Sequence, residues 1–151
     1  MSGSLMTMLM AMVPVIELRG AIPYGVGVAD LSVVHATILA IIGNMIPIPF
    51  LILFTRRVFE WLRTKSAGLE RFVSKMEAKA EKNKEVVLRY EFIGLMILVA
   101  IPLPGTGAWT GALVATVMNL RLRSALPSIG LGVIIAGIIV STMTYGVTVI
   151  V

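Results

Sequence analysis

Apolar residues gather in four stretches along the chain, which cover residues 5–16, 31–55, 92–120 and 125–151. A helix needs about 20 apolar residues to cross the hydrocarbon core of a bilayer. The 25 residues of 31–55 and the 27 residues of 125–151 are long enough, whereas the 12 residues of 5–16 are too few. The pattern therefore predicts two complete crossings and two apolar segments of a different kind.

Proline and glycine interrupt both of the remaining segments. Ala-Ile-Pro-Tyr-Gly-Val-Gly occupies residues 21–27, and Ala-Ile-Pro-Leu-Pro-Gly-Thr-Gly occupies residues 100–107. Proline removes a backbone donor and glycine weakens helices, so both disfavour a continuous helix. Each interrupted segment precedes one long crossing, which indicates two copies of a single unit. The structural hinges that we expect are Gly20, Pro23, Pro102 and Pro104.

Charge is nearly absent outside one region. Of the 151 residues, 58% are hydrophobic and 14% are charged, against about 25% charged in soluble globular domains. Ten of the 13 Lys and Arg residues and six of the 8 Asp and Glu residues lie between positions 56 and 91. So much apolar surface exceeds what a soluble fold of this size can bury, so we expect an integral membrane protein. The charges outside that region are Glu17, Arg19, Asp30, Arg121 and Arg123.

Composition also limits the chemistry. The chain has no cysteine and one histidine, His35, which excludes disulfides and zinc–thiolate sites and leaves no imidazole cluster. We expect no enzyme activity, no metal and no cofactor. The net charge of +5 lies almost wholly in the charged region, so it indicates membrane orientation rather than nucleic-acid binding.

The arginines next to the two crossings predict their orientation. Arg56 and Arg57 follow the first crossing, while Arg121 and Arg123 precede the second. Because Lys and Arg stay on the cytoplasmic side, the first crossing runs inward and the second outward. We expect an all-α integral membrane protein of two inverted repeats, each a re-entrant helical hairpin followed by a transmembrane helix.

These repeats form a single membrane domain, residues 1–151. Its expected parts are repeat 1 at 4–55, a cytoplasmic amphipathic connector at 56–90 and repeat 2 at 91–151. The connector is predicted to be helical because its apolar residues recur at helical spacing. The simplest interpretation is a helix on the cytoplasmic membrane surface, and a lid or a partner-docking helix is the alternative. The apolar face consists of Leu69, Phe72, Val73, Met76 and Ala80.

Glu17 and Arg19 are the charges that orientation leaves unexplained. A charge at the bilayer centre costs about 2.5–3.5 kcal/mol on insertion scales, so such residues usually serve a site. Residues two apart on a helix point to different sides, so we expect unwound backbone at Gly20 and Pro23 to turn both toward one cavity. Burial favours protonated Glu17 and Arg19 favours the carboxylate, which makes Glu17 the candidate for proton coupling and substrate binding. The alternative is a self-neutralising pair at a shallow interface.

The second interrupted segment carries no charge but is rich in backbone donors. Helix N-termini and successive backbone N–H groups attract anions, and a short helix is predicted to begin at Ala108. We expect Gly105, Thr106 and Gly107 to bind substrate there, with a tight turn chosen for its shape as the alternative.

Arg121 and Arg123 have two interpretations. They set the orientation of the second crossing, or they fold back and bind a phosphate, which arginine contacts in a bidentate manner. We include both as candidate substrate-binding residues.

Residues 17–23, Glu-Leu-Arg-Gly-Ala-Ile-Pro, and 102–111, Pro-Leu-Pro-Gly-Thr-Gly-Ala-Trp-Thr-Gly, resemble the prokaryotic small multi-drug export proteins. The resemblance covers nearly the whole chain, and that family is similar to the DedA (VTT-domain) superfamily. It implies two inverted repeats and proton-dependent transport, with translocation of polyprenyl phosphate or another lipid as the activity. By these motifs, Glu17 and Arg19 would be the embedded acid and arginine, and Arg121 and Arg123 the paired arginines.

Three functions remain open at this point. A proton-coupled transporter or flippase of an amphipathic lipid phosphate fits the arginines, the glycine-rich loop and the embedded acid. An exporter of lipophilic cationic drugs would use Glu17 as a shared proton and drug site, although Arg19 would repel a cation. A membrane scaffold without transport needs no buried charge. We expect the first, as a homodimer in the inner (plasma) membrane, with membrane lipids, protons and an amphipathic substrate as partners.

Overall fold

The computed structural model describes residues 2–68, 70–71, 74–75, 78, 84–103 and 106–150, and every regular element in those residues is a helix. This agrees with the all-α expectation. The helices are α1 (Gly3–Met12), α2 (Glu17–Gly27), α3 (Val33–Met45), α4 (Pro47–Lys65), α6 (Lys84–Ala100), α7 (Ala108–Val117) and α8 (Leu122–Ile150).

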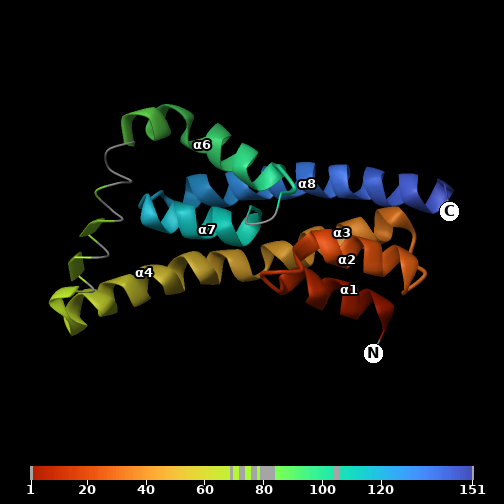
Figure 1. Ribbon diagram of the computed structural model, residues 1–151, viewed down its shortest axis with the longest axis horizontal. Coiled ribbons are helices and arrows are strands. Elements are labelled where there is room, and N and C mark those ends of the chain that lie inside the picture. Colours follow the sequence, from red (N-terminus) through yellow and green to blue (C-terminus); the bar gives the residue numbers. More distant parts are fainter. Residues whose placement is uncertain are drawn as a thin grey trace.

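The helices form two groups, each of which consists of a helical hairpin and a longer helical segment beside it (Figure 1). Helices α1 and α2 form a hairpin beside α3, and helices α6 and α7 form a hairpin beside α8. The turns of the two hairpins meet near the middle of the molecule, and the two hairpins enter this region from opposite ends. This arrangement brings residues near position 17 against residues near position 106.

Two helical segments are long and apolar enough to cross a membrane: Val33–Lys65 and Leu122–Val149. The first bends where α3 ends and α4 begins, because Pro47 cannot donate a helical hydrogen bond. Both segments expose large apolar side chains on their outer surface, including Phe50 and Phe54 of α4 and Ile138 of α8. Such surfaces are favourable against lipid and unfavourable against water.

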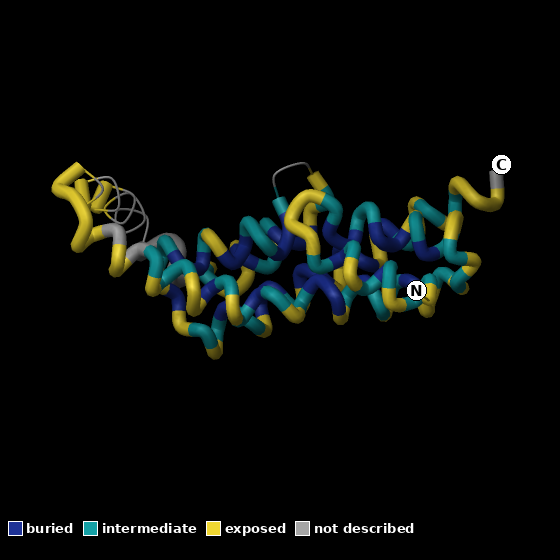
Figure 2. Tube along the Cα trace, turned by 90° about the horizontal axis from the view of Figure 1, so that it is seen from below, coloured by how far each residue is buried: buried dark blue, intermediate teal, exposed yellow. Residues whose placement is uncertain are grey.

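Small residues let the helices pack closely at the centre of the bundle, where the buried residues lie (Figure 2). Ala36 and Ala40 of α3 and Ala136 of α8 are almost completely buried. The hydroxyl groups of Thr37 and Ser141 form a hydrogen bond between α3 and α8. Close approach through small side chains and interhelical hydroxyl bonds is the usual packing of helices in membranes.

The interruption of the first hairpin differs from the prediction. Helix α2 runs without a break through Gly20 and Pro23, so the unwound backbone and hinges expected there are wrong; the turn lies at residues 13–16. Pro14 lies in this turn, and a residue before proline disfavours helix, which ends α1 at Met12. Pro23 is exposed and costs α2 one internal hydrogen bond.

Gly20 serves packing at the start of α2. A Cβ atom on Gly20 would lie 2.5 Å from Cγ2 of Ile16, so the missing side chain makes room for the hairpin turn. The break of the second hairpin agrees with the prediction, since α6 ends at Ala100 and α7 begins at Ala108. Pro104, expected as a hinge, and the apolar face of the connector (Leu69, Phe72, Val73, Met76, Ala80) lie outside the described residues.

Candidate functional site

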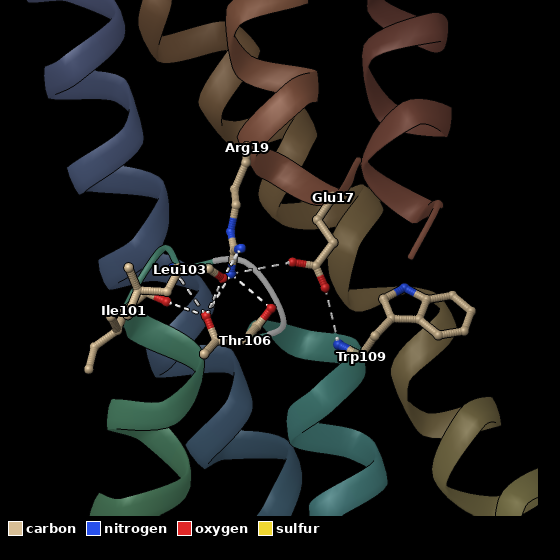
Figure 3. A network of polar contacts seen from close by, with 6 residues as sticks. All are labelled: Glu17, Arg19, Ile101, Leu103, Thr106 and Trp109. Atoms are coloured by element: carbon tan, nitrogen blue, oxygen red, sulfur yellow. Dashed lines mark hydrogen bonds and ion pairs between the residues drawn. The ribbon is translucent and has the colours of Figure 1, made fainter. Parts of the chain in front are cut away.

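The first residues of α2 meet the turn of the second hairpin, and both charges of α2 lie in this contact (Figure 3). Glu17 is the first residue of α2 and is only 4% exposed. Its backbone has a left-handed φ of 48°. The side chains of Glu17 and Arg19 both reach the second hairpin, although they are two residues apart on a helix.

The Glu17 carboxylate lies at the N-terminus of α7. Its Oε1 atom accepts a hydrogen bond of 3.3 Å from the backbone N–H of Trp109, the second residue of that helix. The N-cap residue of α7 is Gly107, which offers no side-chain cap of its own. A carboxylate at this position satisfies a free donor and interacts favourably with the helix dipole. Glu17 therefore caps a helix from the other half of the chain.

Gly107 is required by this contact in two ways. Its φ of 119° is one that residues with side chains rarely adopt. A Cβ atom on Gly107 would also lie 2.1 Å from Oε2 of Glu17. The glycine therefore both starts α7 and leaves the space that the Glu17 carboxylate fills.

This capping changes the expectation for the anion site. We expected the free N–H groups near Gly107 to bind an anionic substrate, but the carboxylate of Glu17 already lies against the helix end they belong to. The chain fills the anion site at the start of α7 with its own acid.

Arg19 binds the oxygen atoms of the same turn. Its guanidinium donates to the carbonyl of Leu103, to the carbonyl of Thr106 at 2.8 Å and to the hydroxyl of Thr106 at 2.9 Å. The Nη2 atom of Arg19 and the Oε2 atom of Glu17 are 4.0 Å apart. The two charges are thus a loose ion pair, and their closer contacts are with the second hairpin rather than with each other.

The hydroxyl of Thr106 links backbone groups of the turn by hydrogen bonds. It lies within hydrogen-bond distance of the carbonyls of Ile101 (2.6 Å) and Leu103 (2.7 Å), which share its single proton. It accepts from the backbone N–H of Leu103 at 3.2 Å and from Arg19. A side chain that bonds several backbone groups at once replaces the helical bonds that this interrupted backbone lacks.

A groove of about 520 Å³ opens beside this network between α2 and α8. Arg19 and Pro102 contribute to it, and Glu17 is not among its lining residues. The other lining residues are mostly apolar: Pro23, Gly27, Val140, Met143, Thr144, Val147 and Thr148. The groove therefore combines apolar walls with the positive charge of Arg19.

The structure brings together only some of the candidate residues. Glu17, Arg19, Thr106 and Gly107 form one network. Arg121 and Arg123 are exposed and follow the C-terminus of α7. The network lies at the N-terminus of that helix, whose length is about 15 Å at 1.5 Å per residue. Gly105 lies outside the described residues.

Residues 17–139 match the family model described as "Putative small multi-drug export protein". The chain belongs to this family. No curated protein and no solved structure matches the chain significantly. The family and the two long apolar segments together make it a membrane protein. The match begins at Glu17 and includes the network and the groove-forming part of α2.

Some groups in the network of this small multi-drug export protein could not be found from sequence. The N–H of Trp109 and the carbonyls of Ile101 and Leu103 are backbone atoms, which carry no residue signature. The left-handed backbone of Glu17 was also missed. The only signal nearby was Pro14, which marks the turn before it.

Proposed function

We propose that this protein transports amphipathic anions across the membrane, with a lipid phosphate such as a polyprenyl phosphate or a phospholipid as the substrate class. The observation that carries the proposal is that Arg19, and not Glu17, is among the residues that line the groove. Arg19 contributes to the groove wall, whereas Glu17 is almost completely buried and lies against α7. The groove thus offers one positive charge and long apolar walls, which suits an anionic headgroup with an apolar tail.

Binding at Arg19 would act on the second hairpin. A guanidinium has five N–H donors, and the hydrogen bonds from the described residues use three of them. A phosphate forms stronger, charge-assisted bonds than the neutral carbonyls of Leu103 and Thr106 do. A bound headgroup would therefore compete for Arg19 and loosen the turn that the arginine holds.

Glu17 would couple this step to protons. As a carboxylate, its negative charge interacts favourably with the dipole at the N-terminus of α7 and so stabilises the contact between Glu17 and that helix. When it takes up a proton, the charge disappears and this attraction is lost. Substrate at Arg19 and a proton on Glu17 would thus weaken the same contact between the two hairpins, which gives a physical basis for coupled transport.

The proposed architecture places this contact within the membrane. We propose two inverted repeats, each a re-entrant hairpin followed by a crossing helix, as in the DedA superfamily. The opposite directions of the two hairpins support this. We further propose an inner-membrane homodimer with a cytoplasmic connector and without enzymatic activity. The contact between Arg56 and Leu120 supports a common side for Arg56, Arg57, Arg121 and Arg123.

Export of lipophilic cationic drugs is the second candidate, and the family description favours it. A cation would have to reach Glu17, which is covered by α7 and lies 4.0 Å from the positive charge of Arg19. A scaffold without transport is the third candidate. The groove lined by Arg19 favours a protein that binds a ligand over a scaffold.

The test compares substrates in vesicles that contain the purified protein. Phosphatidic acid and phosphatidylcholine, each with a fluorescent acyl chain, are supplied in separate preparations, and a lipophilic cationic dye in a third. We expect fast translocation of the phosphatidic acid alone and its loss in Arg19→Gln. Transport of the dye alone, abolished by Glu17→Gln and unaffected by Arg19→Gln, would contradict the proposal in favour of drug export.

A further inference from the structure

Helix α7 lies between two opposite charges that both come from the first half of the chain. Glu17 of α2 lies at its N-terminus, as described above. Arg56 of α4 lies just beyond its C-terminus, where its guanidinium donates a hydrogen bond to the carbonyl of Leu120. The sequence of α7 itself contains no charged residue, so it cannot supply either partner.

The C-terminus of α7 is shaped so that this carbonyl is available. Asn119 has a left-handed φ of 53°, and its N–H bonds to the carbonyl of Thr116 at 3.0 Å. The N–H of Leu120 bonds to the carbonyl of Ala115 at 2.9 Å. These bonds form a Schellman motif, which closes the helix and carries the chain away from it. The carbonyl of Leu120 then accepts from Arg56.

The two charges have the signs that suit the helix dipole. An acid near the N-terminus and a base near the C-terminus both stabilise a helix, and the effect is largest where the charges are partly buried. Arg56 is half-buried, and its Nε atom is buried without a hydrogen-bond partner among the described residues. An arginine that only marked orientation could keep all of its donors in water.

We propose that Arg56 is a positioning residue for transport, which holds the C-terminal end of α7 so that its N-terminal end stays under Glu17 and Arg19. The inference rests on the proposed transport function. Loss of this anchor would let α7 tilt on its remaining contacts and misalign the turn that Arg19 binds. Arg56 touches no substrate in this scheme and acts through α7.

Arg57 provides a matched control. It is the next residue on α4, carries the same charge, and is exposed. Arg56→Gln and Arg57→Gln therefore remove equal charge from the same end of the crossing helix. Cysteines introduced at Asp30 and Ser66 and labelled from one side of the membrane check that both variants keep the orientation of the parent protein.

Two measurements test the proposal. Hydrogen exchange of the purified protein should show faster exchange at the end of α7, including the N–H groups of Asn119 and Leu120, in Arg56→Gln only. Phosphatidic acid translocation should fall about tenfold in maximal rate in Arg56→Gln, because a charged hydrogen bond is lost, with little change in half-saturating concentration. Arg57→Gln should match the parent in both, and Arg56→Lys should recover part of the rate.

The two measurements fail in different ways. If the parent protein translocates no phosphatidic acid, the proposed function fails, while the exchange experiment still tests the anchor. Equal exchange of α7 in Arg56→Gln and Arg57→Gln would overturn the inference, as would a change in half-saturating concentration without a change in rate.

Discussion

The two hairpins have similar shapes but are closed by different forces. The turn of the first, at residues 13–16, is closed by its own backbone: the N–H of Val13 bonds to Met10 at 3.2 Å and that of Glu17 to Val13 at 2.9 Å. The turn of the second also has backbone bonds, from the N–H of Leu103 to Ile101 at 2.9 Å and from that of Thr106 to Leu103 at 3.1 Å, and the Thr106 hydroxyl and Arg19 of the first hairpin add side-chain bonds to it. The second turn therefore receives additional bonds from a side chain of the first hairpin, as well as those of its own backbone.

This difference indicates which part of the molecule can move. Both charges at the contact between the hairpins, Glu17 and Arg19, belong to the first hairpin, and their closest contacts are with the second. A proton or an anion that engages those charges removes support from the second hairpin without breaking the first. We therefore expect the start of α7, rather than the first hairpin, to respond when those charges are engaged.

The largest effect should come from Arg19, because it contributes most of the bonds between the hairpins. Arg19→Gln should lower phosphatidic acid translocation by about 100-fold, since several charged hydrogen bonds are lost together. Arg121→Gln removes the same charge from an exposed position, and we expect it to retain most of the activity. Similar losses in the two variants would show that overall charge, and not the contact between the hairpins, sets the rate.

Gly107→Ala should have the next largest effect, on stability as well as on transport. The left-handed φ of 119° costs a residue with a side chain about 1–3 kcal/mol, and the Cβ atom would push Glu17 away from α7. Thermal unfolding in detergent measures the loss. Gly94→Ala on α6 is the control, because a Cβ atom there meets nothing within 4 Å; it should keep or raise the melting temperature. A similar drop in both would contradict the role of Gly107.

The sequence was sufficient for the helices that are long or sharply interrupted. Hydropathy predicted two long apolar helical segments, and the structure has segments long and apolar enough to cross a membrane at Val33–Lys65 and Leu122–Val149. The dense Pro and Gly residues after Ala100 predicted the break before α7. In these places the local pattern and the tertiary structure agree, because a long apolar run or a cluster of helix breakers leaves few alternatives.

The sequence was insufficient where a single residue could act in two ways. Pro23 and Pro14 both disfavour helix, but only Pro14 ends one; Pro23 is accommodated within α2 at the cost of one bond. Glu17 and Arg19 were identified as site residues from their rarity in apolar sequence. Their partners could not be identified, because a backbone N–H or carbonyl has no residue signature and becomes a partner only when the hairpins meet.

Thr106 tests whether the second hairpin depends on side chains within its own turn. Thr106→Val removes the hydroxyl while keeping the shape, and the lost hydroxyl bonds should cost about 0.5–1.5 kcal/mol of stability, because the carbonyls of Ile101 and Leu103 keep other donors. Thr106→Ser keeps the hydroxyl and should stay close to the parent protein. Unfolding temperature and translocation rate are the measurements. If Thr106→Ser were as impaired as Thr106→Val, the methyl group and not the hydrogen bonds would hold the turn.

Glu17→Gln should have the smallest effect on stability and the most specific effect on transport. The amide keeps an oxygen that accepts from Trp109, so the losses are the interaction of the charge with the α7 dipole, about 0.3–1 kcal/mol, and the loose ion pair with Arg19. Without a group that takes up a proton, translocation should no longer respond to a pH gradient across the vesicle membrane. Glu17→Leu, which has no acceptor, should also lose stability. An unchanged response to the gradient in Glu17→Gln would remove Glu17 from the coupling step and leave it as the cap of α7 alone.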